Sequence, residues 1–121
     1  MEVQVFGVRK SAATRAALRF FAERRVRTHF VDLAERPASP GELRRFAQKL
    51  GAETLVDRDS PRFAALGLAH ARLSIERWIE RLAAEPLLLR MPLVRCREHV
   101  TVGAAEDEWR AWVVASRASE G

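Results

Sequence analysis

Cysteine is nearly absent from this chain of 121 residues, in which Cys96 is the only one. A single cysteine excludes an internal disulfide and any Cys-x-x-Cys redox pair. The sequence also lacks an apolar run near the roughly 20 residues that a membrane helix needs. It enters a predicted strand at once and shows no signal-peptide core, so we expect a cytoplasmic protein without a membrane segment.

Lysine is scarce too. Of the 21 basic residues, only Lys10 and Lys49 are lysines, and the others are arginines. The arginines are interleaved with acids and show no aromatic interleaving of the kind that stacks bases. The net charge of +5 therefore indicates a solvated surface, with a basic patch for an acidic partner as the alternative. We expect no direct nucleic-acid binding. The densest cluster, 24–27, is typical of a helix C-terminus, where positive charge is favourable.

Three histidines, His29, His70 and His99, show no metal-ligand spacing, so no metal site is predicted. An ordinary surface or packed role is favoured for each of them over a catalytic base. With 48% hydrophobic and 31% charged residues, the chain is predicted to form one globular domain, 1–121.

The first third of the chain predicts a strand, a helix and a second strand. An alternating apolar run begins at Val3, a helix over 12–22 follows with Ser11 as its N-cap, and a strand is expected over 28–33. Two strands joined by one helix form a βαβ unit, so they should be parallel.

The middle of the chain predicts helices. Residues 39–42, Ser-Pro-Gly-Glu, form a capping box that begins a helix ending at Gly51. A short helix is expected over 62–66. Ser74 caps the next helix, and its predicted buried stripe is Ile75, Trp78, Ile79 and Leu82.

The last third predicts a hairpin over 94–102 and a helix from Glu106, with Trp109, Trp112 and Val113 on its buried face. The resulting order is β-α-β, a helical middle, then β-β-α. It predicts an α/β protein with a thioredoxin-like fold: a four-stranded mixed sheet, flanking helices and a helical insertion at about 37–86.

The most informative stretch is 7–15, where the first strand turns at Gly7 and the helix begins at Ser11. Free N–H groups at a helix N-terminus attract anions or a reactive thiolate, and Arg9, Lys10 and Arg15 add charge. Yet no cysteine is present there. One interpretation is that Ser11 merely caps the helix; the other is an anion-binding module.

Five segments in this order resemble the arsenate reductase-related ArsC/Spx family, and the resemblance spans nearly the whole chain. They are VFGVRKS (5–11), PASPGEL (37–43), FAALGL (63–68), LLRMPLV (88–94) and VGAAEDE (102–108). The last two are most similar to the Spx-type regulators. The resemblance implies a glutaredoxin-like, thioredoxin-fold domain with a cis-proline at Pro92.

The same resemblance places the family's reactive groups on residues that depart from the pattern. The nucleophilic cysteine falls on Ser11 and the second redox cysteine on Thr14. The arginine before the cis-proline falls on Met91, with Arg90 one residue earlier, and another anion-binding arginine falls on Asp57, with Arg58 beside it.

These departures favour a pseudoenzyme, since a serine hydroxyl cannot pass through thiol–disulfide steps. We expect a non-catalytic binding or regulatory protein with a protein partner, RNA polymerase being the partner implied by the Spx resemblance. No cofactor is required, and the expected small ligands are an oxyanion or glutathione. The candidate ligand-binding residues are Arg9, Lys10, Ser11, Arg15, Arg58, Arg90 and Pro92.

An alternative is an arsenate reductase-like or glutathione-dependent thiol oxidoreductase that uses an external thiol or Cys96. The flanking Arg95 and Arg97 favour a lowered pKa for the Cys96 thiol. Its expected place beside a hairpin turn favours an incidental thiol instead.

Overall fold

A computed structural model describes residues 1–120, Glu120 by its backbone alone; Gly121, the end of the predicted domain, lies outside the described residues. The chain divides into two compact units, Met1–Val31 with Met91–Gly121, and Asp32–Arg90. The predicted insertion at 37–86 falls inside the second unit, while a single domain over 1–121 stays a prediction. Within the described part, no helix is both long and apolar enough to cross a membrane.

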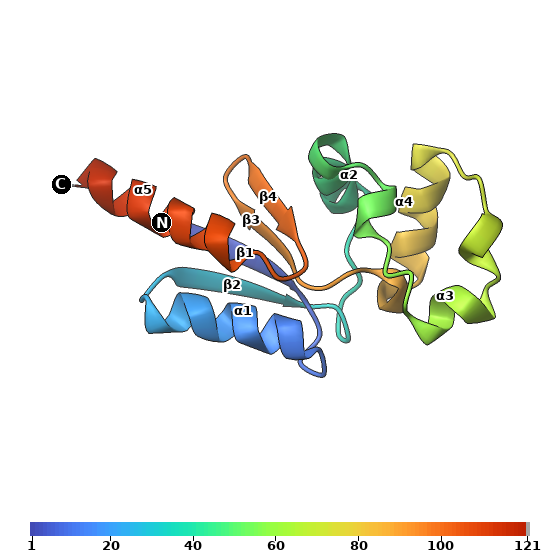
Figure 1. Cartoon of the computed structure of the whole chain (residues 1–121), viewed down its shortest axis with the longest axis horizontal. Helices are drawn as coiled ribbons and strands as arrows, with labels where there is room; N and C mark the ends of the chain where they lie inside the picture. The colour runs from blue at the N-terminus through green and yellow to red at the C-terminus, as the bar shows by residue number, and fades with distance from the viewer. Residues whose placement is uncertain (121) are drawn as a thin grey trace. The chain divides into compact units, whose positions relative to one another are not determined.

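The first unit is built on a four-stranded sheet in the order β2-β1-β3-β4. Its elements are β1 (Glu2–Gly7), α1 (Ala12–Glu23), β2 (Arg27–Asp32), β3 (Leu93–Cys96), β4 (His99–Val102) and α5 (Glu106–Glu120). β1 pairs antiparallel with β3, and β3 with β4. β1 and β2 run in the same direction in Figure 1, which confirms the predicted mixed sheet.

The core of this unit joins both helices to the sheet. The ring of Trp109 from α5 lies 5.6 Å from Phe20 and 5.4 Å from Phe21 of α1, measured between centroids. These rings share one buried cluster with Val3 and Val5 of β1, so the two helices cover the same face of the sheet. The Trp109 indole N–H donates to Thr101 Oγ1 at 2.8 Å, which satisfies its only polar group.

The second unit is helical, as predicted. Its elements are α2 (Pro40–Leu50), η1 (Glu53–Leu55), α3 (Pro61–Ala65), η2 (Leu68–His70), α4 (Ile75–Ala84) and η3 (Pro86–Leu88). The capping box is present: the Glu42 N–H donates to Ser39 Oγ at 3.1 Å, and the Ser39 N–H donates to Glu42 Oε1 at 2.9 Å. α2 ends at Leu50 and is capped by Gly51, whose φ of 85° suits glycine.

The predicted stripe of α4 is correct except at its first residue. Trp78, Ile79 and Leu82 are buried, whereas Ile75 is 60% exposed. Ile75 is the first helical residue after the Ser74 cap, and helical side chains tilt toward the N-terminus. No earlier turn of helix lies under that side chain, so it extends into solvent.

Candidate functional site

Ser11 caps helix α1, as the sequence predicts. Its Oγ accepts from the Thr14 N–H at 3.1 Å, and its own N–H donates to the Val8 carbonyl at 3.0 Å. These two bonds fix the turn between β1 and α1. In the described chain the N–H groups of Ala12 and Ala13 have no acceptor, so the helix start keeps two donors for an anion.

The three cations predicted at this turn, Arg9, Lys10 and Arg15, differ in the contacts that their side chains make. The Arg15 guanidinium donates to the Arg9 carbonyl at 2.7 Å and so ties the helix to the turn. The Arg9 guanidinium lies over the Phe30 ring of β2, 4.8 Å from its centroid, a cation–π contact. Lys10 is exposed, and its side chain has no hydrogen bond or ion pair with another of the described residues. It is therefore the cation most available to a ligand.

Thr14 is a core residue behind the turn. Its side chain is fully buried, and Oγ1 has no hydrogen-bond partner among the described residues. It lies against the backbone of Gly7, where an added Cβ would meet Thr14 Oγ1 and stand 2.7 Å from Thr14 Cγ2. Thr14, where the resemblance places the second redox cysteine, is therefore a packing residue. Its side chain leaves no room for a Cβ at position 7.

Pro92 lies at the same end of the paired strands β1 and β3 as this turn. The Met91–Pro92 peptide bond is cis, as the family resemblance implied. Phe6 is paired with Leu93, and in an antiparallel pair the residue after Phe6 then faces the residue before Leu93. Pro92 therefore lies opposite Gly7, at the point where the chain leaves β1 for Ser11. Its carbonyl accepts from the Gly103 N–H at 2.9 Å.

Arg58 and Arg90 belong to the second unit and lie on neighbouring segments of it. Val56 and Leu89 form an isolated bridge, and the Arg90 N–H donates to the Leu55 carbonyl at 2.8 Å. The Arg90 side chain donates to the Thr54 carbonyl at 3.4 Å, and Arg58 lies 3.9 Å from a Glu53 oxygen. Both side chains are exposed. Their role at the Ser11 turn stays a prediction.

In the described part of the chain, no histidine forms a hydrogen bond at this turn. His29 is exposed on β2, and His99 is exposed on β4 with its ring 6.0 Å from that of Trp112. His70 belongs to the second unit. None of them is a hydrogen-bond partner of Ser11, whose Oγ is engaged at the helix cap. Across the described residues, no group of His, Cys, Asp and Glu could hold a metal ion.

The prediction of a lowered pKa at Cys96 is wrong. Burial raises the pKa of this half-buried thiol above its ordinary value and outweighs the opposing charge of Arg97. The Arg95 guanidinium is engaged elsewhere, with Gln4 Oε1 and the Arg97 carbonyl. Cys96 is the last residue of β3, three residues beyond Leu93, or about 10 Å along the strand. The thiol is therefore at the opposite end of β3 from Pro92.

A second group of arginines lies at the other end of α1. Arg24 and Arg25 follow the helix, and Arg117 of α5 donates to the Arg24 carbonyl at 2.8 Å. Sequence reasoning found only the first two, as part of the cluster at 24–27. Arg117 is 93 residues away, so no local pattern could have joined it to them.

The fold and the Gly7–Ser11 turn define the class of protein: an α/β domain of the thioredoxin-like type, with a mixed sheet, a cis-proline and a capped helix after the first strand. The model of the ArsC family matches residues 6–112, and the chain belongs to that family.

Solved structures carry the same fold. A protein titled YFFB is 24% identical, with a TM-score of 0.83, and the match covers 90% of this chain and 96% of that one. An arsenate reductase from Vibrio cholerae is 22% identical, with a TM-score of 0.79 and coverage of 89% and 94%. An arsenate reductase (ArsC) related protein from Brucella melitensis is 19% identical, with a TM-score of 0.68 and coverage of 93% and 94%. At these identities the likeness establishes the fold alone. No curated protein matches the chain.

Proposed function

We propose that this ArsC-family chain is a cytoplasmic, non-redox binding protein in which the nucleophile turn has become an oxyanion-binding turn. The observation that carries the proposal is the Ser11 hydroxyl, which accepts the Thr14 N–H at 3.1 Å. The family resemblance implies a thiol at this position. Serine holds the helix start as a good N-cap, but its oxygen cannot change oxidation state.

The chemistry of the turn supports binding better than turnover. An anion at the helix start would meet the N–H groups of Ala12 and Ala13, the positive end of the helix dipole and the charge of Lys10. A nucleophilic serine would need a neighbouring base, and no described side chain hydrogen-bonds to its hydroxyl. The geometry thus offers donors and charge without an activated nucleophile.

A titration with phosphate and arsenate, followed by NMR, tests the oxyanion site. We expect saturable shifts of the amides of residues 12–15, and binding several-fold weaker in Lys10→Gln, because one full charge is lost. Lys49→Gln is the matched control, since it removes the only other lysine, which is in the last turn of α2 in the second unit. Shifts that are absent, or equal in the two variants, would overturn the site.

The alternative function is reduction of arsenate or a disulfide with an external thiol such as glutathione. Structural neighbours titled arsenate reductase favour it. The position of Cys96 at the hairpin end of β3, with its raised pKa, counts against the version in which that thiol serves the Ser11 turn.

Turnover assays with glutathione and glutaredoxin separate the two functions. We expect no reduction of arsenate or disulfide by the wild-type chain or by Cys96→Ser. Ser11→Cys is the positive control, because it returns a thiol to a helix N-terminus, where its pKa is lowered. Turnover by the wild type would contradict the non-redox proposal, and its loss in Cys96→Ser would identify the sulfur that is used.

The proposed partner is a protein, and RNA polymerase is the candidate that the Spx resemblance suggests. Purified bacterial RNA polymerase and the tagged chain should co-elute in a stoichiometric complex at low salt. Separate elution would remove the transcription role and leave the oxyanion site to be judged by the NMR titration.

A further inference from the structure

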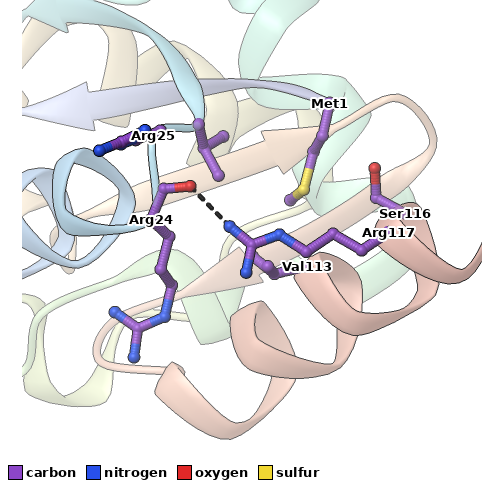
Figure 2. Close-up of a pocket in the computed structure, with 7 residues that line it drawn as sticks. Met1, Arg24, Arg25, Val113, Ser116 and Arg117 are labelled. Carbon is purple, nitrogen blue, oxygen red and sulfur yellow. Dashed lines mark hydrogen bonds between the residues drawn. The ribbon is translucent and has the colours of Figure 1, made fainter. Parts of the chain in front are cut away.

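A pocket of about 180 Å³ opens at the end of helix α1 that lies away from Ser11 (Figure 2). Three arginines line it: Arg24 and Arg25 after α1, and Arg117 from α5. Met1, Val26 and Val113 add apolar surface, and Ser116 adds a hydroxyl. We call this site the arginine pocket. No carboxylate is among its lining residues in the described chain.

Arg117 is the cation at the centre of the pocket. Figure 2 shows its guanidinium between the Arg24 backbone and the side chain of Val113, with the Arg24 guanidinium directed away. One of its nitrogens donates to the Arg24 carbonyl at 2.8 Å, which holds the planar group in place. Among the described residues it has no carboxylate partner, and its other N–H groups are left for a ligand.

Negative carbonyls at the end of α1 would repel an anion, but nearby donors already occupy them. The Arg24 side chain donates to the Phe20 carbonyl at 3.1 Å, and the Val26 N–H donates to the Phe21 carbonyl at 3.0 Å. The Arg25 N–H takes the Ala22 carbonyl at 3.0 Å. With these acceptors occupied, the field in the pocket is set mainly by Arg117 and Arg25, since the Arg24 guanidinium is directed away and lies 3.9 Å from a Glu23 oxygen.

The size and lining of the pocket restrict the ligand. A cavity of about 150 Å³ can hold a benzene ring, so the space suits a small molecule and not a long chain. A fixed guanidinium prefers two oxygens in one plane, as in a carboxylate or a phosphate. The apolar side chains of Met1, Val26 and Val113 suit a short aliphatic or aromatic body beside that group.

We propose that the arginine pocket binds a small organic oxyanion, with its carboxylate or phosphate on Arg117 and its apolar body against Met1, Val26 and Val113. The site is separate from the oxyanion turn at Ser11. It lies at the other end of a helix about 18 Å long, so the two sites can be occupied independently.

NMR titration with phenyl phosphate and with benzoate tests the proposal, with phenol as the uncharged probe. We expect saturable shifts of the Val26 and Ser116 amides with the two anions and none with phenol. Whichever of the two anions binds more tightly shows whether the pocket prefers a phosphate or a carboxylate. Arg117→Gln should weaken binding about tenfold or more, since a charge-assisted bond is lost. Arg110→Gln is the matched control on the same helix, because Arg110 is engaged with Asp107 and Glu106.

Arg25→Gly is a second variant that keeps the fold, because Arg25 already has a left-handed φ of 57°. It removes one charge from the pocket lining and should weaken phenyl phosphate binding several-fold. Equal affinity in wild type, Arg117→Gln and Arg25→Gly would overturn the pocket. Shifts confined to residues 12–15 would also overturn it, while supporting the oxyanion turn, so the two proposals can fail separately.

Discussion

The two ends of helix α1 differ in which groups are exposed to solvent and to ligands. At the first turn the backbone supplies donors, a serine cap fixes the chain, and Lys10 is the available cation. At the last turn the carbonyls are covered by arginine side chains and N–H groups, and Arg117 is held there by α5. The same helix therefore offers positive charge at both ends, from its own dipole at one end and from side chains at the other.

The largest effect is expected from Gly7→Ala, which should destabilise the first unit by about 2 kcal/mol. The added methyl would meet the fully buried Thr14 side chain. Urea unfolding measures the loss. Gly41→Ala is the control, since its nearest contact would be 3.9 Å away at Ser39 Oγ, and no loss is expected there. Wild-type stability in Gly7→Ala would show that the turn can shift away from Thr14.

Removing the cap with Ser11→Ala should cost about 1 kcal/mol, because the Thr14 N–H loses its acceptor. Ser11→Asp should restore most of the stability, since aspartate is an equally good N-cap. Ser74→Ala gives the comparison in α4, where the Ser74 hydroxyl accepts from the Arg77 N–H at 3.2 Å. If Ser11→Ala is neutral while Ser74→Ala is not, the α1 cap contributes nothing to stability.

At the other end, Arg25→Gly should stabilise the chain by about 1 kcal/mol, because glycine adopts a φ of 57° without a steric cost. Arg19→Gly, in the exposed middle of the same helix, should destabilise by a similar amount. Thermal unfolding should then show a raised melting temperature for Arg25→Gly and a lowered one for Arg19→Gly. A loss in both would show that the Arg25 side chain itself stabilises the turn.

The smallest effect is expected from Thr14→Val, which should raise stability by about 0.5 kcal/mol because it replaces an unpaired buried hydroxyl. Thr101→Val is the contrasting variant. There the hydroxyl accepts from the buried Trp109 indole, so its removal leaves an unsatisfied N–H and should destabilise. Chemical denaturation of both variants shows whether an unseen partner satisfies Thr14.

Features that depend on neighbouring residues could be predicted from the sequence. The Ser11 cap and the Ser39–Glu42 capping box are made within four residues, so the motif contains all the atoms involved. Element ends differ by about one residue: the sequence predicts the second strand at 28–33, and the structure has it at Arg27–Asp32.

Features that depend on tertiary packing could not be predicted from the sequence. The charge flanking Cys96 suggested a lowered pKa, but burial on the sheet determines the direction. The family resemblance places a redox position at Thr14, and only the fold shows that this residue is packed against Gly7. Arg117 joins Arg24 through the approach of α5 to α1, which no local pattern contains.

The buried tryptophans make each unit visible by fluorescence. Trp109 is in the core of the first unit, Trp78 is in that of the second, and the chain has no tyrosine to add emission. In a Trp112→Phe background, replacing either remaining indole by phenylalanine leaves a single emitter. The loss of structure in each unit can then be followed alone, and coincident transitions would mean that the two units unfold as one cooperative body.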